Sequence, residues 1–348
     1  MPCMRHHINF PRRHPMKLGI TGHGPIVTTF LEAVGNVEHV EAVAIYNRPT
    51  SAEAGKALAA KFNIPTIYND FDAFLADETV DTVYLALPNA LHYEYAIRVM
   101  EAGKNAIVEK PFACTESQAQ EMIDLAKEKG LFLFEAISAC HMPNVKKLKE
   151  LLPRIGDISI VQCDYSQYSS RYDDLMNGKL TNIFDPRMAG GCLMDVNCYN
   201  IHFVTEIFGE PEYIEYFPRM NACGTDTSGI AMLQYSTFPA SCIGAKDSAS
   251  GSFGQIQGRY GNLTINGPVG FAPSVTLHLR GQEPETFQLQ PFTNRLTYEV
   301  IDFEDIFQRK DFAARDALLE HSLLVVRLLE EARLSAGITF PCDIEADE

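Results

Sequence analysis

Residues 16–34 read MKLGITGHGPIVTTFLEAV, and this stretch decides the fold of the chain. It predicts a short apolar strand over 17–21, a turn with two glycines, and a helix over 26–34. The first glycine allows a tight turn, and the second lets the backbone approach a pyrophosphate at the helix N-terminus. Because Val27 replaces the third glycine of the GxGxxG fingerprint, the turn indicates a dinucleotide site only through its place between strand and helix. The candidate cofactor contacts in this turn are Gly22, Gly24, Pro25 and Ile26.

The alternation of strand and helix continues through residue 137. Strands are predicted over 41–46, 82–87, 105–108 and 132–134, and helices over 51–62, 71–75, 91–102 and 116–129. Such an order is typical of βαβ units, and the almost wholly apolar run 82–87 suits a strand inside a parallel sheet. We therefore expect an α/β Rossmann domain with a doubly wound parallel sheet over residues 16–137.

Residues 138–348 show a different pattern. Strand-like segments that alternate apolar and polar residues cover 157–168, 213–220, 228–235, 240–247, 254–260, 262–266 and 275–280, and helices are predicted over 144–152, 191–208 and 314–336. This order predicts an α+β domain with a large open, mostly antiparallel sheet and helices on one face, which binds substrate and mediates oligomerisation. A sheet face without helices would suit the interface of a homodimer or homotetramer.

Composition argues against several classes of protein. The chain has 348 residues, of which 46% are hydrophobic and 21% charged, as is ordinary for a globular protein. Its net charge of −16 argues against a nucleic-acid partner, because a duplex binder needs clustered Lys and Arg. Apolar runs fall far short of the roughly 20 residues of a membrane span, so we expect a soluble protein that does not bind membranes.

The cysteines and the N-terminus bear on location. Nine scattered cysteines without a CxxC pair favour reduced thiols in a cytoplasmic protein, and no histidine spacing predicts a metal site. Residues 1–15 are basic and lack the apolar segment of a secretory signal. We expect a disordered extension or an upstream start, with a transit peptide as the alternative.

The second predicted strand ends in Asn47 and Arg48, which are candidate cofactor contacts. NAD-selective sites usually place Asp or Glu here, to bind the ribose 2′-hydroxyl. A carboxylate would repel a 2′-phosphate, whereas a guanidinium can pair with it. The sequence thus predicts that NADP is preferred over NAD. Alternatively, Arg48 is a solvated loop residue that stacks on adenine and accepts either cofactor.

Two further motifs follow strands whose carboxyl ends should meet at one edge of the sheet. Pro88, Asn89 and His92 come after the strand 82–87. Glu109, Lys110 and Pro111 come after the strand 105–108, which places a fixed positive charge beside a nicotinamide. Taken alone, the lysine could equally be an ordinary surface residue. We count Pro88, Asn89, His92, Glu109 and Lys110 among the candidate cofactor contacts.

These motifs together resemble the glucose–fructose oxidoreductase / inositol dehydrogenase / MocA family. The likeness extends from Met16 to the final helix and includes Glu135-Ala136 and Gly190-Gly191-Cys192-Leu193-Met194-Asp195. It implies that Lys110 is the catalytic lysine and that Asp195 begins a second motif, often Asp-x-x-x-His. Tyr199 occupies the histidine position here, which is similar to the subgroup with glucose–fructose oxidoreductase and dimeric dihydrodiol dehydrogenases.

Helical spacing supports the same residues independently. Asp195, Tyr199 and His202 stand at i, i+4 and i+7, on one predicted helix face. A nearby Lys⁺ favours phenolate and so lowers the pKa of a tyrosine that must accept a proton. We predict Lys110, Asp195 and Tyr199 as catalytic residues, with Asp195 orienting or charge-balancing the lysine. Gln167, Arg171 and His202 are substrate candidates. Alternatively, Tyr199 and His202 are packed core residues, and Gln167 and Arg171 are ordinary polar residues of a loop.

The predicted activity is hydride transfer between a nicotinamide and a secondary alcohol or carbonyl of a sugar, polyol or cyclic diol. The partner is then a small, carbohydrate-like substrate. A non-catalytic NAD(P)-binding sensor is the main alternative, because some members of such a family bind other proteins. A redox-neutral enzyme that keeps its nucleotide bound is a third.

Overall fold

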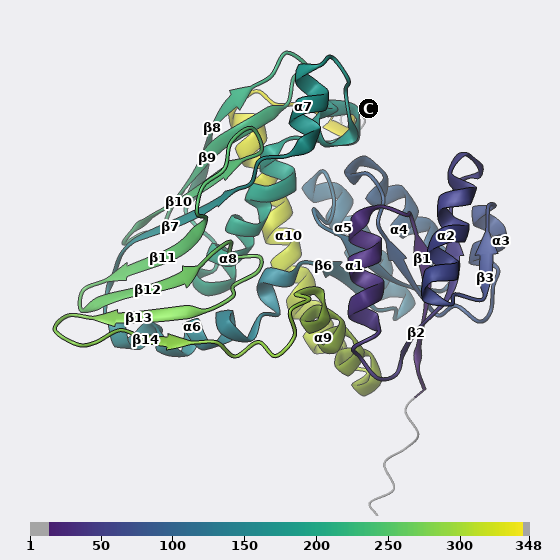
Figure 1. Cartoon of the computed structure of the whole chain (residues 1–348), viewed down its shortest axis with the longest axis horizontal. Coiled ribbons are helices and arrows are strands. Elements are labelled where there is room, and N and C mark those ends of the chain that lie inside the picture. The colour runs from purple at the N-terminus through teal and green to yellow at the C-terminus, as the bar shows by residue number, and fades with distance from the viewer. Residues whose placement is uncertain (1–13, 344–348) are drawn as a thin grey trace, which may run out of the picture.

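The glycine turn follows the first strand of a six-stranded parallel sheet in the computed structural model, which describes residues 14–343. The strand order is β3-β2-β1-β4-β5-β6, as expected for a doubly wound sheet (Figure 1). Its strands are β1 (Met16–Thr21), β2 (Val40–Tyr46), β3 (Thr66–Tyr68), β4 (Thr82–Leu85), β5 (Asn105–Glu109) and β6 (Leu133–Ala136). Except for residues 14 and 15, the predicted N-terminal extension lies outside the described residues.

Apolar cores lie on both faces of this sheet. The helices are α1 (Pro25–Val34), α2 (Ala52–Phe62), α3 (Phe71–Leu75), α4 (His92–Glu101) and α5 (Glu116–Lys129), with 3₁₀ turns η1 (Pro49–Ser51) and η2 (Asn89–Leu91). Phe30 of α1 stacks on Tyr84 of β4 with ring centroids 3.6 Å apart, and both rings are fully buried. Phe74 and Met122 are buried in the other core. Burial on both faces explains why the central strands are apolar throughout.

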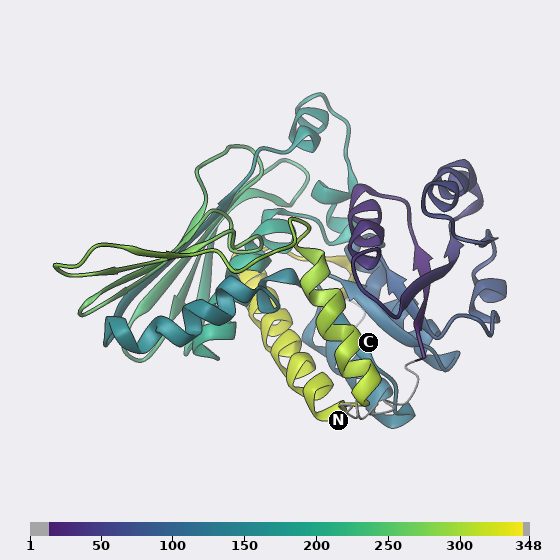
Figure 2. The ribbon, with the colours of Figure 1, turned by 60° about the horizontal axis from the view of Figure 1, so that its bottom comes forward.

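The second sheet has eight strands in the order β14-β13-β12-β11-β7-β10-β9-β8. All neighbours are antiparallel except β7 and β10, so the sheet is mostly antiparallel, as predicted. The strands are β7 (Ile158–Ser166), β8 (Tyr213–Met220), β9 (Asp226–Gln234), β10 (Pro239–Ala245), β11 (Phe253–Gly258), β12 (Gly261–Asn266), β13 (Val275–Leu279) and β14 (Glu285–Phe287). Helices cover one face of this sheet and leave the other open (Figures 1 and 2).

The remaining helices lie in residues 138–343, and η6 among them is described below. They are η3 (Ser138–Cys140), α6 (Pro143–Ile155), α7 (Ser170–Met176), η4 (Asn182–Phe184), η5 (Pro186–Met188), α8 (Cys198–Phe208), α9 (Leu296–Arg309), α10 (Phe312–Ser335) and η7 (Pro341–Asp343). Helix α9 packs beside α1, and α10 contacts both α5 and α8, so the chain returns to the first domain at its end (Figure 2). No described helix is long and apolar enough to cross a membrane.

Among the described strands and α-helices, the predictions omitted β3, α7, β14 and α9, and they mistook the start of α8. The segment expected as one α-helix over 191–208 begins as a π-helix, η6 (Leu193–Asn197), and continues as α8. Gly191 precedes it with φ +128°, and the Leu193 N–H donates to the Asp226 carboxylate at 2.7 Å. A turn with i→i+5 bonds is common at functional sites, and this one presents Asp195 to the cavity described next.

Candidate active site

A cavity of about 860 Å³ lies between the carboxyl ends of the parallel strands and the second sheet. This is where ligands bind in open α/β sheets, and the volume suits a small-molecule site. Most of the predicted site residues line it: Gly22, Gly24, Pro25, Ile26, Asn47, Arg48, Pro88, Asn89, Glu109, Lys110, Gln167, Arg171, Asp195 and Tyr199. The fold therefore brings together residues from six separate segments of the chain.

The glycine turn has the shape of an anion cradle. Gly22 has φ +86°, and a Cβ there would lie 2.5 Å from the Ala86 carbonyl oxygen, so only glycine fits the turn. Gly24 is the N-cap of α1, and a Cβ built on it would meet nothing within 4 Å. The open space at a helix N-terminus fits the pyrophosphate of a dinucleotide.

The end of β2 carries no carboxylate toward this cavity. The acids of the described chain that line the cavity are Glu109 and Asp195, and both lie at its other end, beside Lys110. Asn47 is buried, with its amide oxygen 3.0 Å from His23 Nδ1, and Arg48 is exposed at the rim. The end of β2 thus offers a guanidinium and no carboxylate, a combination that suits a 2′-phosphate.

Lys110 is held by Asp195 in a charged cluster. Its Nζ donates to the Asp195 carbonyl oxygen at 2.7 Å and to Asp195 Oδ1 at 2.9 Å, and Lys246 binds Oδ2. Burial would lower the pKa of Lys110, but Asp195, together with Tyr199 and Cys198, outweighs burial and holds that pKa well above its ordinary value. Two lysines around one carboxylate leave a net positive charge.

Tyr199 is contacted by two cations. Arg295 Nη2 donates to the Tyr199 hydroxyl at 3.2 Å, and the Lys110 Nζ lies 5.1 Å from the ring centroid. The expectation that the lysine lowers the pKa of Tyr199 is only half right. Arg295 and Lys110 do lower it, but burial is the larger effect and the net pKa is raised. The resting side chain is thus a neutral phenol.

Two predicted cofactor contacts, His92 and Glu109, form hydrogen bonds within the protein. His92 is fully buried and does not reach the cavity, because its ring lies 2.8 Å from the Pro111 carbonyl oxygen and 2.9 Å from that of Leu87. It holds the segments after β4 and β5 together. Glu109 does line the cavity, but its carboxylate accepts a 2.6 Å hydrogen bond from the Tyr84 hydroxyl.

His202, a predicted substrate contact, does not line the cavity. It is fully buried and lies beside His321 and Glu135, away from the cavity that Asp195 and Tyr199 line. Seven residues advance a helix by about 10 Å, so a shared face does not imply a shared cavity. By contrast, Gln167 and Arg171 line the outer part of the cavity, where Arg171 pairs with Asp174 at 3.3 Å.

Sequence reasoning missed Arg295, Lys246 and Tyr165, which also line the cavity. Arg295 directly precedes α9, and that helix was not expected. The apolar residues Leu296, Val300 and Phe303 are spaced as on a helix and could have revealed it. Lys246 and Tyr165 lie at strand ends, and nothing in their local sequence distinguishes them from surface residues.

A parallel sheet that presents an open glycine turn to a cavity with a lysine and a tyrosine is typical of dinucleotide-dependent oxidoreductases. Comparison with known proteins agrees. Residues 16–137 match the family described as "Oxidoreductase family, NAD-binding Rossmann fold", and residues 145–270 match the "GFO/IDH/MocA C-terminal domain". The chain belongs to the GFO/IDH/MocA family and is an NAD(P)-dependent oxidoreductase.

Several relatives span nearly the whole chain. It is 33% identical over 328 residues to scyllo-inositol 2-dehydrogenase (NADP(+)) IolU of Bacillus subtilis (strain 168), covering 94% of this chain and 99% of that protein. It is 28% identical to trans-1,2-dihydrobenzene-1,2-diol dehydrogenase of Mus musculus, covering 94% and 99%. KijD10, a 3-ketoreductase from Actinomadura kijaniata solved with NADP and TDP-benzene, superposes with a TM-score of 0.81 at 23% identity over 92% and 98%, which shows the fold alone. These relatives are named as enzymes, which favours catalysis over the sensor alternative.

Proposed function

We propose that the protein is an NADP-preferring dehydrogenase or reductase that acts on a secondary alcohol or carbonyl of a sugar, polyol or cyclic diol. The absence of a carboxylate beside Arg48 in the described cavity supports NADP. The relatives support the substrate class, because they are named as a scyllo-inositol 2-dehydrogenase and a trans-1,2-dihydrobenzene-1,2-diol dehydrogenase.

The residues divide the chemistry between them. A bound nicotinamide supplies the acceptor or donor of hydride. Tyr199 exchanges the proton of the substrate hydroxyl, and Lys110 holds positive charge where the substrate oxygen becomes negative. Asp195 fixes the position of the Lys110 ammonium through its carbonyl and carboxylate oxygens. Gln167 and Arg171 are proposed to contact the substrate, because they line the same cavity.

One observation carries this proposal: the Lys110 ammonium lies 5.1 Å from the Tyr199 ring centroid, on the wall of the cavity that the open Gly24 turn also lines. Lys110→Ala and Tyr199→Phe should each lower kcat by about 100-fold or more while NADP still binds. Turnover is followed by reduced-nicotinamide absorbance with NADP⁺ and a panel of polyols. Tyr172→Phe is the matched control and should keep its activity. Near-full activity of Tyr199→Phe would refute the role of its hydroxyl.

The proposal also covers the roles of the two domains, the assembly of the protein and its location. We assign residues 16–137 to cofactor binding and 138–348 to substrate binding and assembly, although α9 and α10 pack back on the first domain. The open face of the eight-stranded sheet would pair two copies in a homodimer, or four in a homotetramer. The scattered cysteines favour a cytoplasmic location.

A further inference from the structure

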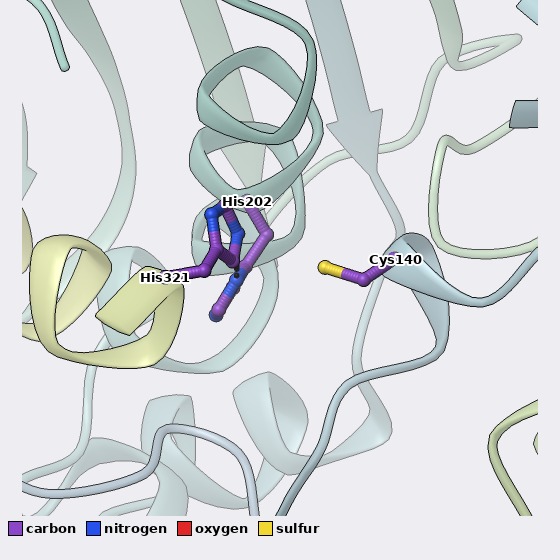
Figure 3. A group of neighbouring side chains, drawn as sticks. All are labelled: Cys140, His202 and His321. Carbon is purple, nitrogen blue, oxygen red and sulfur yellow. Dashed lines mark hydrogen bonds between the residues drawn. The ribbon is translucent and has the colours of Figure 1, made fainter. Parts of the chain in front are cut away.

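Cys140, His202 and His321 come together on the side of α8 that faces away from the catalytic cavity. One ligand atom from each lies within 4.8 Å of the others, and Figure 3 shows the Cys140 sulfur directed toward the two imidazoles. The three residues come from separate elements: η3, which follows the first sheet, then α8, and then α10. The catalytic mechanism uses none of them, and none lines the cavity.

The two histidines already have the spacing of ligands on one ion. His202 Nδ1 and His321 Nε2 lie 3.2 Å apart, and Figure 3 marks this contact with a dashed line. Two nitrogens bound at about 2.0–2.1 Å to one tetrahedral Zn²⁺ would lie about 3.3 Å apart. The separation therefore fits a shared ion as well as it fits a hydrogen bond between two rings.

The other nitrogen of His202 faces a carboxylate. His202 Nε2 lies 3.4 Å from Glu135 Oε1, and both side chains are almost fully buried. Neither His202 Nε2 nor Glu135 Oε2 has a hydrogen-bond partner among the described residues. Histidines that bind a metal through one nitrogen usually donate the other N–H to a carboxylate, which fixes the tautomer. Glu135 is positioned for that role at 3.4 Å, and His202 Nδ1 faces His321 Nε2, so an ion shared by the two rings would replace the contact between them.

We propose that Cys140, His202 and His321 form a binding site for a divalent transition metal, best suited to Zn²⁺. One thiolate with two imidazoles is a donor set that Zn²⁺ accepts, with water in the fourth position. His321 is partly exposed, so an ion can enter from solvent. Bound there, the ion would link the segment after β6 to α8 and α10 and so stabilise the connection between the two domains.

Cobalt provides the first test, because Co²⁺ bound to a thiolate has a charge-transfer absorption band that reports the Cys140 sulfur directly. The N-terminal segment contains Cys3, His6 and His7, which could bind metal themselves. All metal measurements therefore use the full chain with Cys3→Ser, His6→Gln and His7→Gln, which is the parent chain of these experiments. We expect one Co²⁺ per chain with a thiolate charge-transfer band, and one equivalent of Zn²⁺ should abolish that band by displacement.

Single substitutions then identify the ligands. Cys140→Ser should remove the charge-transfer band, and His321→Gln should weaken Zn²⁺ binding by about tenfold or more. Zn²⁺ should raise Tm in the parent chain and leave it unchanged in these two variants. Cys223→Ser and His278→Gln are matched controls outside the cluster and should bind metal like the parent. NADP binding, measured without metal, shows that each variant is folded.

The outcomes separate the possibilities. A charge-transfer band that persists in Cys140→Ser, or Co²⁺ binding without such a band in the parent chain, would overturn the site. So would equal Zn²⁺ affinity in His321→Gln and the parent, and the cluster would then be a hydrogen-bonded histidine pair beside Glu135. Loss of dehydrogenase activity alone would bear on the proposed function and not on the metal site.

Discussion

At the scale of single residues, the two glycines of the first turn have different roles. Gly22 is required by the backbone, since its φ is positive and a Cβ would collide with the Ala86 carbonyl oxygen. Gly24 is extended, with φ −67° and ψ 170°, so alanine fits its backbone without strain. The methyl group of an alanine at position 24 would project into the open space in front of α1, where a pyrophosphate would lie.

Gly24→Ala should therefore weaken NADP binding by about tenfold or more while Tm changes little. Titration of cofactor fluorescence gives the affinity, and calorimetry gives Tm. Gly35→Ala is the control, because its helical φ of −61° and ordinary contacts accept a methyl group away from the cavity. A variant at position 24 with parental affinity would place the dinucleotide elsewhere.

Arg295 should set the pH dependence of alcohol oxidation. Its guanidinium lowers the raised pKa of Tyr199, so removing that charge raises the pKa further. Oxidation needs Tyr199 to accept a proton, and its rate rises with pH toward that pKa. In Arg295→Gln, the alkaline rise of kcat/KM should move to higher pH. Arg171→Gln, which lines the same cavity but pairs with Asp174, should keep the parental profile. An unshifted Arg295→Gln profile would contradict this account.

At the scale of elements, the π-helix is anchored by Asp226 at the start of β9. The carboxylate accepts the Leu193 N–H and the Tyr216 hydroxyl, and a Cβ on Gly191 would lie 2.1 Å from Asp226 Oδ1. This close contact requires glycine at 191, and the resulting turn carries Asp195 toward Lys110. The family resemblance contained this glycine, but only the tertiary contact explains it.

Burial raises the pKa of Asp226 to about 6, which gives a stability prediction with a definite sign. Between its unfolded value near 4 and about 6, the folded state binds more protons, so stability falls as pH rises. Asp226→Asn lacks this titration. The free energy of unfolding of Asp226→Asn relative to the parent should therefore increase by about 2 kcal/mol from pH 4 to pH 7, whatever hydrogen bonds it loses. Urea unfolding at both pH values measures this, and the exposed Asp124→Asn should show no such trend.

At the scale of the whole molecule, the open face of the second sheet carries large exposed apolar residues. Phe217 of β8 is 58% exposed and pairs in register with Ile230 of β9, which is 41% exposed. Apolar side chains grouped on a face without helices are typical of an interface between proteins. Phe217→Lys should therefore convert a dimer to monomers, as measured by light scattering across a concentration series.

The matched control for this prediction is Ile67→Lys, on the short edge strand β3 of the other domain, where the isoleucine is 39% exposed. It should leave the mass unchanged. A parent chain that is monomeric at every concentration would remove the proposed interface altogether.

The sequence by itself determined the parallel sheet, the glycine turn and the residues at strand ends such as Pro88 and Lys110. These depend on local pattern, because periodicity, turn chemistry and the carboxyl ends of parallel strands repeat in every such fold. It also placed Asp195 and Tyr199 in one helical segment, although Asp195 belongs to the π-helix η6 and Tyr199 to the α-helix α8 that continues it.

Only the tertiary structure decided which distant groups meet. Arg295 reaches Tyr199 through an unpredicted helix, and Lys246 completes the charges around Asp195 from the end of a strand in the other sheet. Only the structure shows that His202 lies beside His321 and Cys140 and not in the cavity. Which neighbours a helical side chain meets depends on the elements that pack against its part of the helix. Spacing within a segment is a local property, whereas contacts between segments follow from packing of the whole chain.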